Sequence, residues 1–283
     1  MRYLSSAALL MFTSMVFSVS ETYATAFSFS TGNPDGKIGT ASRPSSVGTI
    51  EIESADDFIL TQSTSINQAT FTGLLPTGAA VNQVRLEIYR VFPKDSGNPP
   101  SGNVPTRVNS PSDVAFQERD DTNGLSFSVT NLGAFSVANS VINGINAIPN
   151  QTTGGEGAVS GNEVIFSVAL SQPFVLPADH YFFIPQVQVT GGEFLWLSAP
   201  KPIVVPGTPF APDLQSWIRN ENLAPDWLRI GTDVVGGSPA PTFNAAFSLA
   251  GQTAVPEPSS LFLLGAGLVS LAAWRRKRVL GAL

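Results

Sequence analysis

The chain has 283 residues, of which 13% are charged, and it contains no cysteine and a single histidine. The lack of thiols excludes disulfides, cysteine catalysis and thiolate metal sites, and one histidine is too few for a conventional zinc or copper site. Without Arg2, Glu21 and four basic residues near the C-terminus, residues 27–258 hold 10 basic and 20 acidic residues. Their net charge of −10 argues against binding nucleic acid or anionic lipid.

The first 26 residues have the order of a secretory signal. Arg2 precedes an apolar stretch over residues 7–19, and Ala24 and Ala26 form a small-x-small cleavage site around Thr25. This order predicts a signal peptide over residues 1–26, with a helical apolar segment, and therefore an exported protein. The alternative is an uncleaved signal anchor, for which the apolar run is short.

Residues 27–252 are numerous enough for one domain with its own core. Apolar and polar residues alternate with a period of two in several segments, as in half-buried strands, and turn-forming clusters separate these segments. Strands are predicted at residues 27–30, 49–52, 58–61, 69–72, 84–89, 125–130, 163–170, 180–189, 194–197 and 243–249. This pattern predicts an all-β fold, an antiparallel β-sandwich with a jelly-roll-like arrangement.

Two short segments are the best helical candidates. They are residues 137–145 and residues 214–220, the second after a cap residue at Asp213. Both are shorter than a typical globular helix, so they do not change the predicted fold class.

Acidic residues cluster at the start of the predicted domain. Asp56 and Asp57 are adjacent, and a strand turns adjacent side chains to opposite faces, so the two do not converge as a glycosidase pair. Glu51, Glu53 and Asp57 would share one face, which we interpret as a solvated strand surface that discourages edge pairing. A carboxylate pair assembled from distant strands would leave no local motif, so a hydrolase stays open as an alternative.

A second acidic segment could bind a hard cation. It comprises Glu118, Asp120, Asp121 and Asn123, just before Gly124. Carboxylate and amide oxygens suit calcium, but the spacing does not fit an EF-hand loop. A polar turn leading into the next strand is the favoured interpretation, and no cofactor other than calcium is suggested.

His180 begins a predicted apolar strand. A catalytic serine with His180 as its base would be expected in a Gly-x-Ser-x-Gly turn, which the sequence lacks. We therefore favour a structural histidine at a strand end.

Trp217 and Trp227 lie in irregular segments beside Arg219 and Arg229. Exposed and coplanar, these two indoles could form a platform for sugar rings. Burial in the core or under a loop is the alternative, because large aromatic side chains are usually buried.

The last residues combine three features. Pro256, Glu257 and Pro258 precede an uncharged apolar run over residues 261–274, and the basic residues Arg275, Arg276, Lys277 and Arg278 follow it. A helix over residues 259–274 would be about 24 Å long, just under the roughly 30 Å hydrocarbon core. We expect a marginal transmembrane helix at about residues 260–274, with the basic residues on the cytoplasmic side.

This tail, residues 253–283, resembles the PEP-CTERM sorting signal. The resemblance implies recognition of Pro256, Glu257 and Pro258 by exosortase, a membrane-embedded protease, with residues 261–274 as anchor and the four basic residues as stop. It implies a protein held at the inner membrane facing the periplasm, and then placed at the cell surface or outside the cell. Exosortase, the secretion machinery and exopolysaccharide are the implied partners. The alternative is a plain membrane anchor behind a proline-containing linker.

Segments of the central domain also resemble the β-sandwich domain of many PEP-CTERM and other secreted bacterial proteins. They are residues 56–60, 66–73, 86–89 and 243–251. This likeness supports the fold and implies no chemistry. The sequence therefore predicts a non-enzymatic surface or matrix protein, with a carbohydrate-binding module and a polysaccharide hydrolase as the alternatives.

Overall fold

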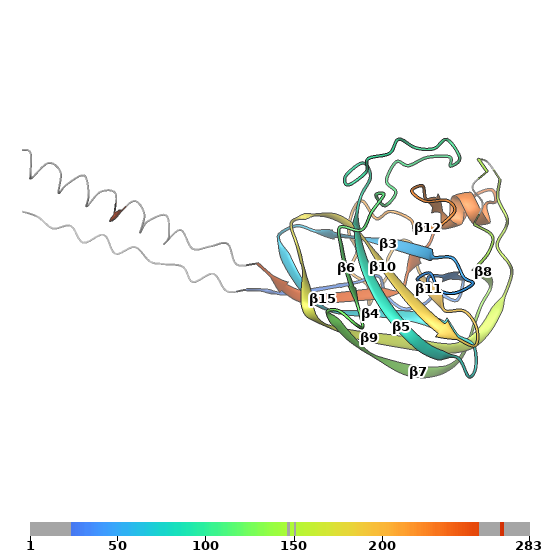
Figure 1. The fold of residues 1–283 in the computed structure, drawn as a ribbon, viewed down its shortest axis with the longest axis horizontal. Coiled ribbons are helices and arrows are strands. Elements are labelled where there is room, and N and C mark those ends of the chain that lie inside the picture. Colours follow the sequence, from blue (N-terminus) through green and yellow to red (C-terminus); the bar gives the residue numbers. More distant parts are fainter. Residues whose placement is uncertain (1–23, 146–147, 150, 255–266, 269–283) are drawn as a thin grey trace, which may run out of the picture. The chain divides into compact units, whose positions relative to one another are not determined.

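Alternating apolar and polar residues build two β-sheets in the computed structural model of the chain (Figure 1). The structure describes residues 24–145, 148, 149, 151–254, 267 and 268. Within them the secondary structure is nearly all β, and Thr25–Ala254 form one unit. The predicted all-β class is therefore confirmed.

The larger sheet has nine strands and is built around β4 (Thr64–Leu75), which pairs with strands on both sides. Its main path runs β1 (Ala26–Ser30), β15 (Phe247–Thr253), β4, β11 (Leu195–Ala199), β2 (Ile38–Ala41) and β8 (Asn139–Val141). β14 (Asn244–Ala245) pairs with β11, while β9 (Val159–Leu176) joins β4 to β7 (Leu125–Val137). β2 and β8 are parallel, which corrects the prediction of a purely antiparallel fold.

The smaller sheet has six strands. Their order is β13 (Leu228–Arg229), β12 (Trp217–Asn220), β3 (Ile52–Leu60), β10 (Asp179–Thr190), β5 (Ala80–Arg90) and β6 (Gln117–Asp120). The π-helix η1 (Ile230–Val235) follows β13 directly. β3 and β10 are interior strands of this sheet, so each is hydrogen-bonded to a neighbouring strand at both edges.

Aromatic side chains from both sheets pack into one core. Phe183 of β10 stacks on Phe247 of β15 with ring centroids 5.0 Å apart, and both rings are buried. Phe71 of β4 stacks on Phe166 of β9 at 4.7 Å. Since large buried rings dominate core energetics, this shared layer holds the two sheets face to face as a sandwich.

The predicted strands agree with the structure to within a residue, with two exceptions. Of residues 49–52 only Ile52 is in a strand, and the single strand predicted at residues 243–249 is divided into β14 and the start of β15. The observed β3 begins at Ile52 and runs through the acidic residues to Leu60. A sequence window full of carboxylates argues against a buried strand. Here the acids are accommodated by partners distant in the sequence, which periodicity cannot reveal.

Both predicted helices are wrong. Residues 137–145 contain the end of β7 and all of β8, and residues 214–220 contain β12. β8 pairs with β2 and β12 pairs with β3, so long-range ladders override the weak local helix signal.

The predicted signal helix and the predicted transmembrane helix at about 260–274 lie outside the described residues, apart from positions 24–26, 267 and 268. In the part of the chain that the structure describes, no helix is long and apolar enough to cross a membrane. The jelly-roll arrangement stays a prediction.

Candidate functional site

The outer face of the six-stranded sheet carries a buried cluster of charges around Arg219. The Arg219 guanidinium binds both carboxylate oxygens of Glu53, with Nη2 3.0 Å from Oε1, and it also lies 2.9 Å from the Tyr89 hydroxyl. Its Nη1 donates to the Asp113 carbonyl at 3.1 Å, and the Trp227 ring centroid lies 4.3 Å away. Arg219 is therefore paired and stacked on several sides, as a structural buried ion requires.

A second buried arginine fixes the loop that covers this cluster. Arg107 Nη1 donates to Asp226 at 3.0 Å, and Nη2 donates to Asp113 at 3.1 Å. Arg107 and Asp226 are 2% and 0% exposed. The loop between β5 and β6 is thus tied to the segment after β12, and it shields the outer face of the sheet from water.

Beside Arg219, three glutamates gather at one edge of the cluster. Glu87 is buried, and its Oε2 has no hydrogen-bond partner among the described residues. Arg85 Nη1 lies 3.9 Å from the other oxygen. Burial, together with the charges of Glu53 and Glu51, raises the pKa of Glu87 well above its ordinary value. This side chain therefore takes up a proton more readily than an exposed glutamate.

His180 pairs with an aspartate and not with a serine. Its Nε2 lies 2.5 Å from Asp57 Oδ2, and the Leu214 backbone N–H lies 3.1 Å from each Asp57 oxygen. Burial lowers the pKa of His180 to about 4. In the described part of the chain no serine hydroxyl is hydrogen-bonded to His180, and the Ser216 hydroxyl donates to Asp56. The arrangement is a histidine–aspartate pair in which Asp57 is buried and His180 is partly exposed.

Asp56 points to the opposite side of β3, as the alternation of a strand predicts. Its Oδ2 accepts the backbone N–H of Ala245 on β14 at 2.8 Å, and Oδ1 accepts the Ser216 hydroxyl at 3.0 Å. Asp56 therefore links the two sheets. The prediction that the acids on the other side of β3 form a solvated surface is wrong, because Glu53 and Asp57 are 3% and 1% exposed. Arg219 and the covering loops replace water there.

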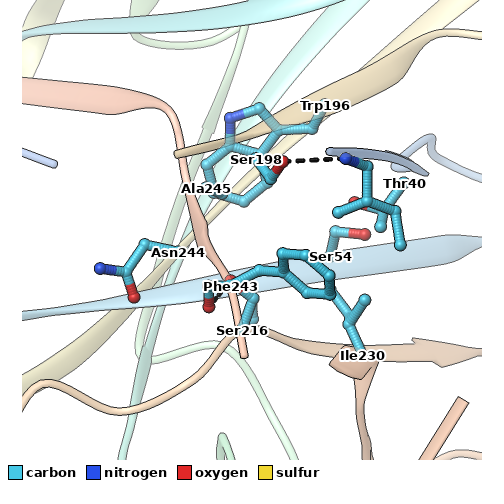
Figure 2. Close-up of a pocket in the computed structure, with 11 residues that line it drawn as sticks. Thr40, Ser54, Trp196, Ser198, Ser216, Ile230, Phe243, Asn244 and Ala245 are labelled. Carbon is cyan, nitrogen blue, oxygen red and sulfur yellow. Dashed lines mark hydrogen bonds between the residues drawn. The ribbon is translucent and has the colours of Figure 1, made fainter. Parts of the chain in front are cut away.

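Figure 2 shows a small cavity between β2, β3 and β14. Its volume is about 10 Å³, and its lining includes the hydroxyl-bearing residues Thr40, Ser54, Ser198 and Ser216 together with Trp196 and Phe243. Ser198 Oγ accepts the Ile38 backbone N–H at 3.0 Å. A volume of this size has room for about one water molecule, so it does not fit a sugar ring.

Neither predicted ligand site forms as expected. Trp217 and Trp227 are 1% and 0% exposed, so they do not form a platform for sugars, and Trp227 Nε1 instead donates to the Ser112 carbonyl at 3.1 Å. The loop between β5 and β6 buries them.

The predicted calcium cluster of Glu118, Asp120, Asp121 and Asn123 is likewise not assembled. Asp120 Oδ1 accepts the N–H and the hydroxyl of Thr122 at 2.8 and 2.6 Å, as in a polar turn. Among the described residues, no group of three or more acidic or histidine side chains could hold a metal.

Sequence reasoning missed the open side of the sandwich. A groove of about 380 Å³ lies between β7 and the β4–β5 hairpin, and it is lined by Leu75, Pro76, Val81, Val129 and Val164, among others. One sequence signal was available, because no charged residue occurs between Gly124 and Gly155.

The two processing signals flank the folded unit. Ala26 is the first residue of β1 and pairs with Gln252 of β15, while the Thr253 N–H donates to the Thr25 carbonyl at 2.9 Å. Ala24 lies just before this pairing. The sorting residues Pro256, Glu257, Pro258, Arg275, Arg276, Lys277 and Arg278 lie outside the described residues.

Residues 254–277 match the family model of the PEP-CTERM protein-sorting motif. No curated protein and no solved structure matches the chain. The predicted resemblance of the tail is therefore confirmed, and the motif implies export, processing by exosortase and sorting to the cell surface.

Proposed function

Since the tail carries a PEP-CTERM sorting motif, we propose that this chain is a non-catalytic protein of the cell surface or extracellular matrix. The sorting motif is the observation that carries the proposal. The use of the charged residues supports it, because Asp56, Asp57 and Glu53 are buried and each is hydrogen-bonded to partners within the fold. A hydrolase would need at least two of its carboxylates to reach a substrate.

The tail would act as a temporary anchor. Residues 261–274 would hold the exported chain in the inner membrane, facing the periplasm, with Arg275–Arg278 as the cytoplasmic stop. Exosortase would then cut near Pro256, Glu257 and Pro258 and release the domain for the surface or the matrix. The two prolines suit such a cut because a proline fixes its own φ and disfavours a helical conformation at the residue before it.

Removal of the signal peptide would help to expose this strip. Cleavage after Ala26 takes away Thr25 and Ala26, which pair with Thr253 and Gln252 just before the sorting motif. Gln252 and Thr253 would then have no strand paired with them on the β1 side. We therefore expect the first cleavage to make the second site more accessible.

Exosortase dependence tests the proposal directly. The full chain is produced in a host that has exosortase and in an isogenic strain that lacks it, and the intact mass and location of the product are measured. We expect the segment after the motif to be lost only in the first strain. Glu257→Gln should reduce this loss, while Glu221→Gln, at an exposed acid outside the motif, should not. An identical membrane-bound product in both strains would overturn the proposal.

A neutral matrix polysaccharide is the second candidate partner, and one surface favours it. A shallow groove of about 450 Å³ lies over β4, β9 and β7, and its lining includes the polar residues Gln68, Thr70, Ser126, Ser128 and Ser167. Hydroxyl and amide groups suit neutral sugars. Co-sedimentation of the processed protein with the host's insoluble polysaccharide tests this, and no retention above that of an unrelated acidic protein would remove it.

A further inference from the structure

The free edges of the two sheets differ in length and charge. β1, β8 and β13 have five, three and two residues, while β6 has four and includes Glu118, Arg119 and Asp120. Short or charged edges resist pairing with other chains. β7 has 13 residues with neither charge nor proline, and Figure 1 shows it at the border of the larger sheet.

The outer side of β7 offers unpaired backbone groups. β7 pairs only with β9, and among the described residues no backbone hydrogen bond joins residues 125–136 to another strand. The register is regular over residues 125–131 and shifts between Asn131 and Gly133, where Gly133 has φ +111°. This bulge limits the regular free edge to seven residues.

Apolar side chains line the space next to this edge. Val129 and Leu132 are 38% and 52% exposed, and Val129 lines the groove of about 380 Å³ together with Val81 and Leu75. A strand added to β7 would direct alternate side chains into that groove. Backbone pairing and apolar burial would therefore occur together.

Charge indicates which strand can approach. The nine strands of the larger sheet contain one charged residue, Glu163 of β9. Residues 27–258 as a whole carry a net charge of −10, which repels a second copy over most of the surface. The β7 edge is the long edge on which two copies meet without like charges facing each other.

We propose that two copies of this chain pair antiparallel through residues 125–131 of β7, which joins their larger sheets into one. Pairing centred on Ser128 places that residue opposite itself on the two-fold axis, and it places Phe127 opposite Val129 of the second copy. Aromatic and β-branched residues form favourable cross-strand pairs. The interface is isologous, as in most homodimers.

A single introduced thiol tests this register, because the chain has no cysteine of its own. Ser128→Cys in the full chain should form a disulfide-linked dimer under mild oxidation, since facing residues across an antiparallel pair lie within disulfide reach. Ser28→Cys, at an exposed serine on the β1 edge, is the matched control and should stay monomeric.

Sedimentation of the full chain in detergent provides a second measurement. Ser128→Asp places two like charges on the axis, and we expect it to raise the dimer dissociation constant at least about tenfold. The melting temperature at a protein concentration where both chains are monomeric should stay unchanged. Ser28→Asp should leave the constant unchanged. A monomeric parent chain, equal disulfide formation by both cysteine variants, or disulfide formation with a different protein would overturn the proposal.

Discussion

The outer faces of the two sheets differ in charge and in whether loops cover them. The nine strands of the larger sheet contain one charged residue, Glu163, and their outward side chains are mostly small and polar. The six-stranded sheet holds Glu53, Glu87 and Arg219 on its outer face, where two loops bury them. A covered face must satisfy its charges internally, whereas an open neutral face stays available for partners.

The sharpest test of this contrast is removal of Arg219. Arg219→Ala leaves Glu53 buried without its positively charged partner and removes the contact with Trp227. Breaking a buried pair on one side costs about 3 to 5 kcal/mol of unfolding free energy. Urea denaturation at neutral pH measures the loss.

Arg85→Ala is the matched control for this experiment. Arg85 lies on the same sheet, but its side chain is 29% exposed and its ion-pair distances are 3.5 and 3.9 Å. We expect a loss of about 1 kcal/mol or less, as for surface pairs. Equal losses for the two variants would contradict the view that the covered cluster is held by its internal pairs.

His180 should make the unfolding free energy of the protein depend on pH. Its folded-state pKa is about 4, below the ordinary 6.5, because burial disfavours the charged imidazole. The unfolded chain binds a proton between these values and the folded chain does not, so stability falls as pH falls from 6.5 to 4. The unfolding free energy of His180→Gln minus that of the parent chain should therefore be about 2 kcal/mol larger at pH 4.5 than at pH 7.5. Urea denaturation at both values checks this, and a difference independent of pH would show that His180 does not titrate differently on folding.

Glu87 should have the opposite effect on stability, because its contribution decreases as pH rises. Its raised folded-state pKa gives a stabilising contribution below pH 4.5, which is lost as pH rises through the folded value. Glu87→Gln should therefore raise the unfolding free energy at pH 7 by about 1 to 2 kcal/mol and should have less effect at pH 4.5. The exposed Glu221→Gln serves as control. A loss of stability at pH 7 would mean that the Glu87 charge has a favourable partner.

The sequence predicted the neutral sheet better than the charged one. In β9 and β15, alternation located the strands, because the pattern of apolar and polar residues matches the buried and exposed faces. β3 was predicted only in part, since its acids resemble a solvated surface until Arg219, 166 residues away from Glu53, supplies the partner. Pairing over such a separation leaves no local signal.

The predicted ligand sites failed for a related reason. Trp217 and Trp227 lie in segments with turn-like composition, which suggests exposure, but the loop between β5 and β6 covers both. The position of a covering loop depends on buried pairs such as Arg107 with Asp226, which join residues 119 positions apart. The sorting motif, in contrast, is a linear signal, so the sequence alone was sufficient to find it.

The smallest expected effect concerns the open face itself. Ser167 lies on β9 between Thr70 of β4 and Ser128 of β7, is exposed, and lines the shallow groove with both of them. A lysine side chain at this exposed position would extend into water beside small polar residues. Ser167→Lys should therefore change the unfolding free energy by no more than about 0.5 kcal/mol. Urea denaturation at two protein concentrations measures it. A loss above about 1 kcal/mol that grows with protein concentration would mean that this face is covered by another molecule in solution, and the contrast between an open and a covered sheet would then not hold.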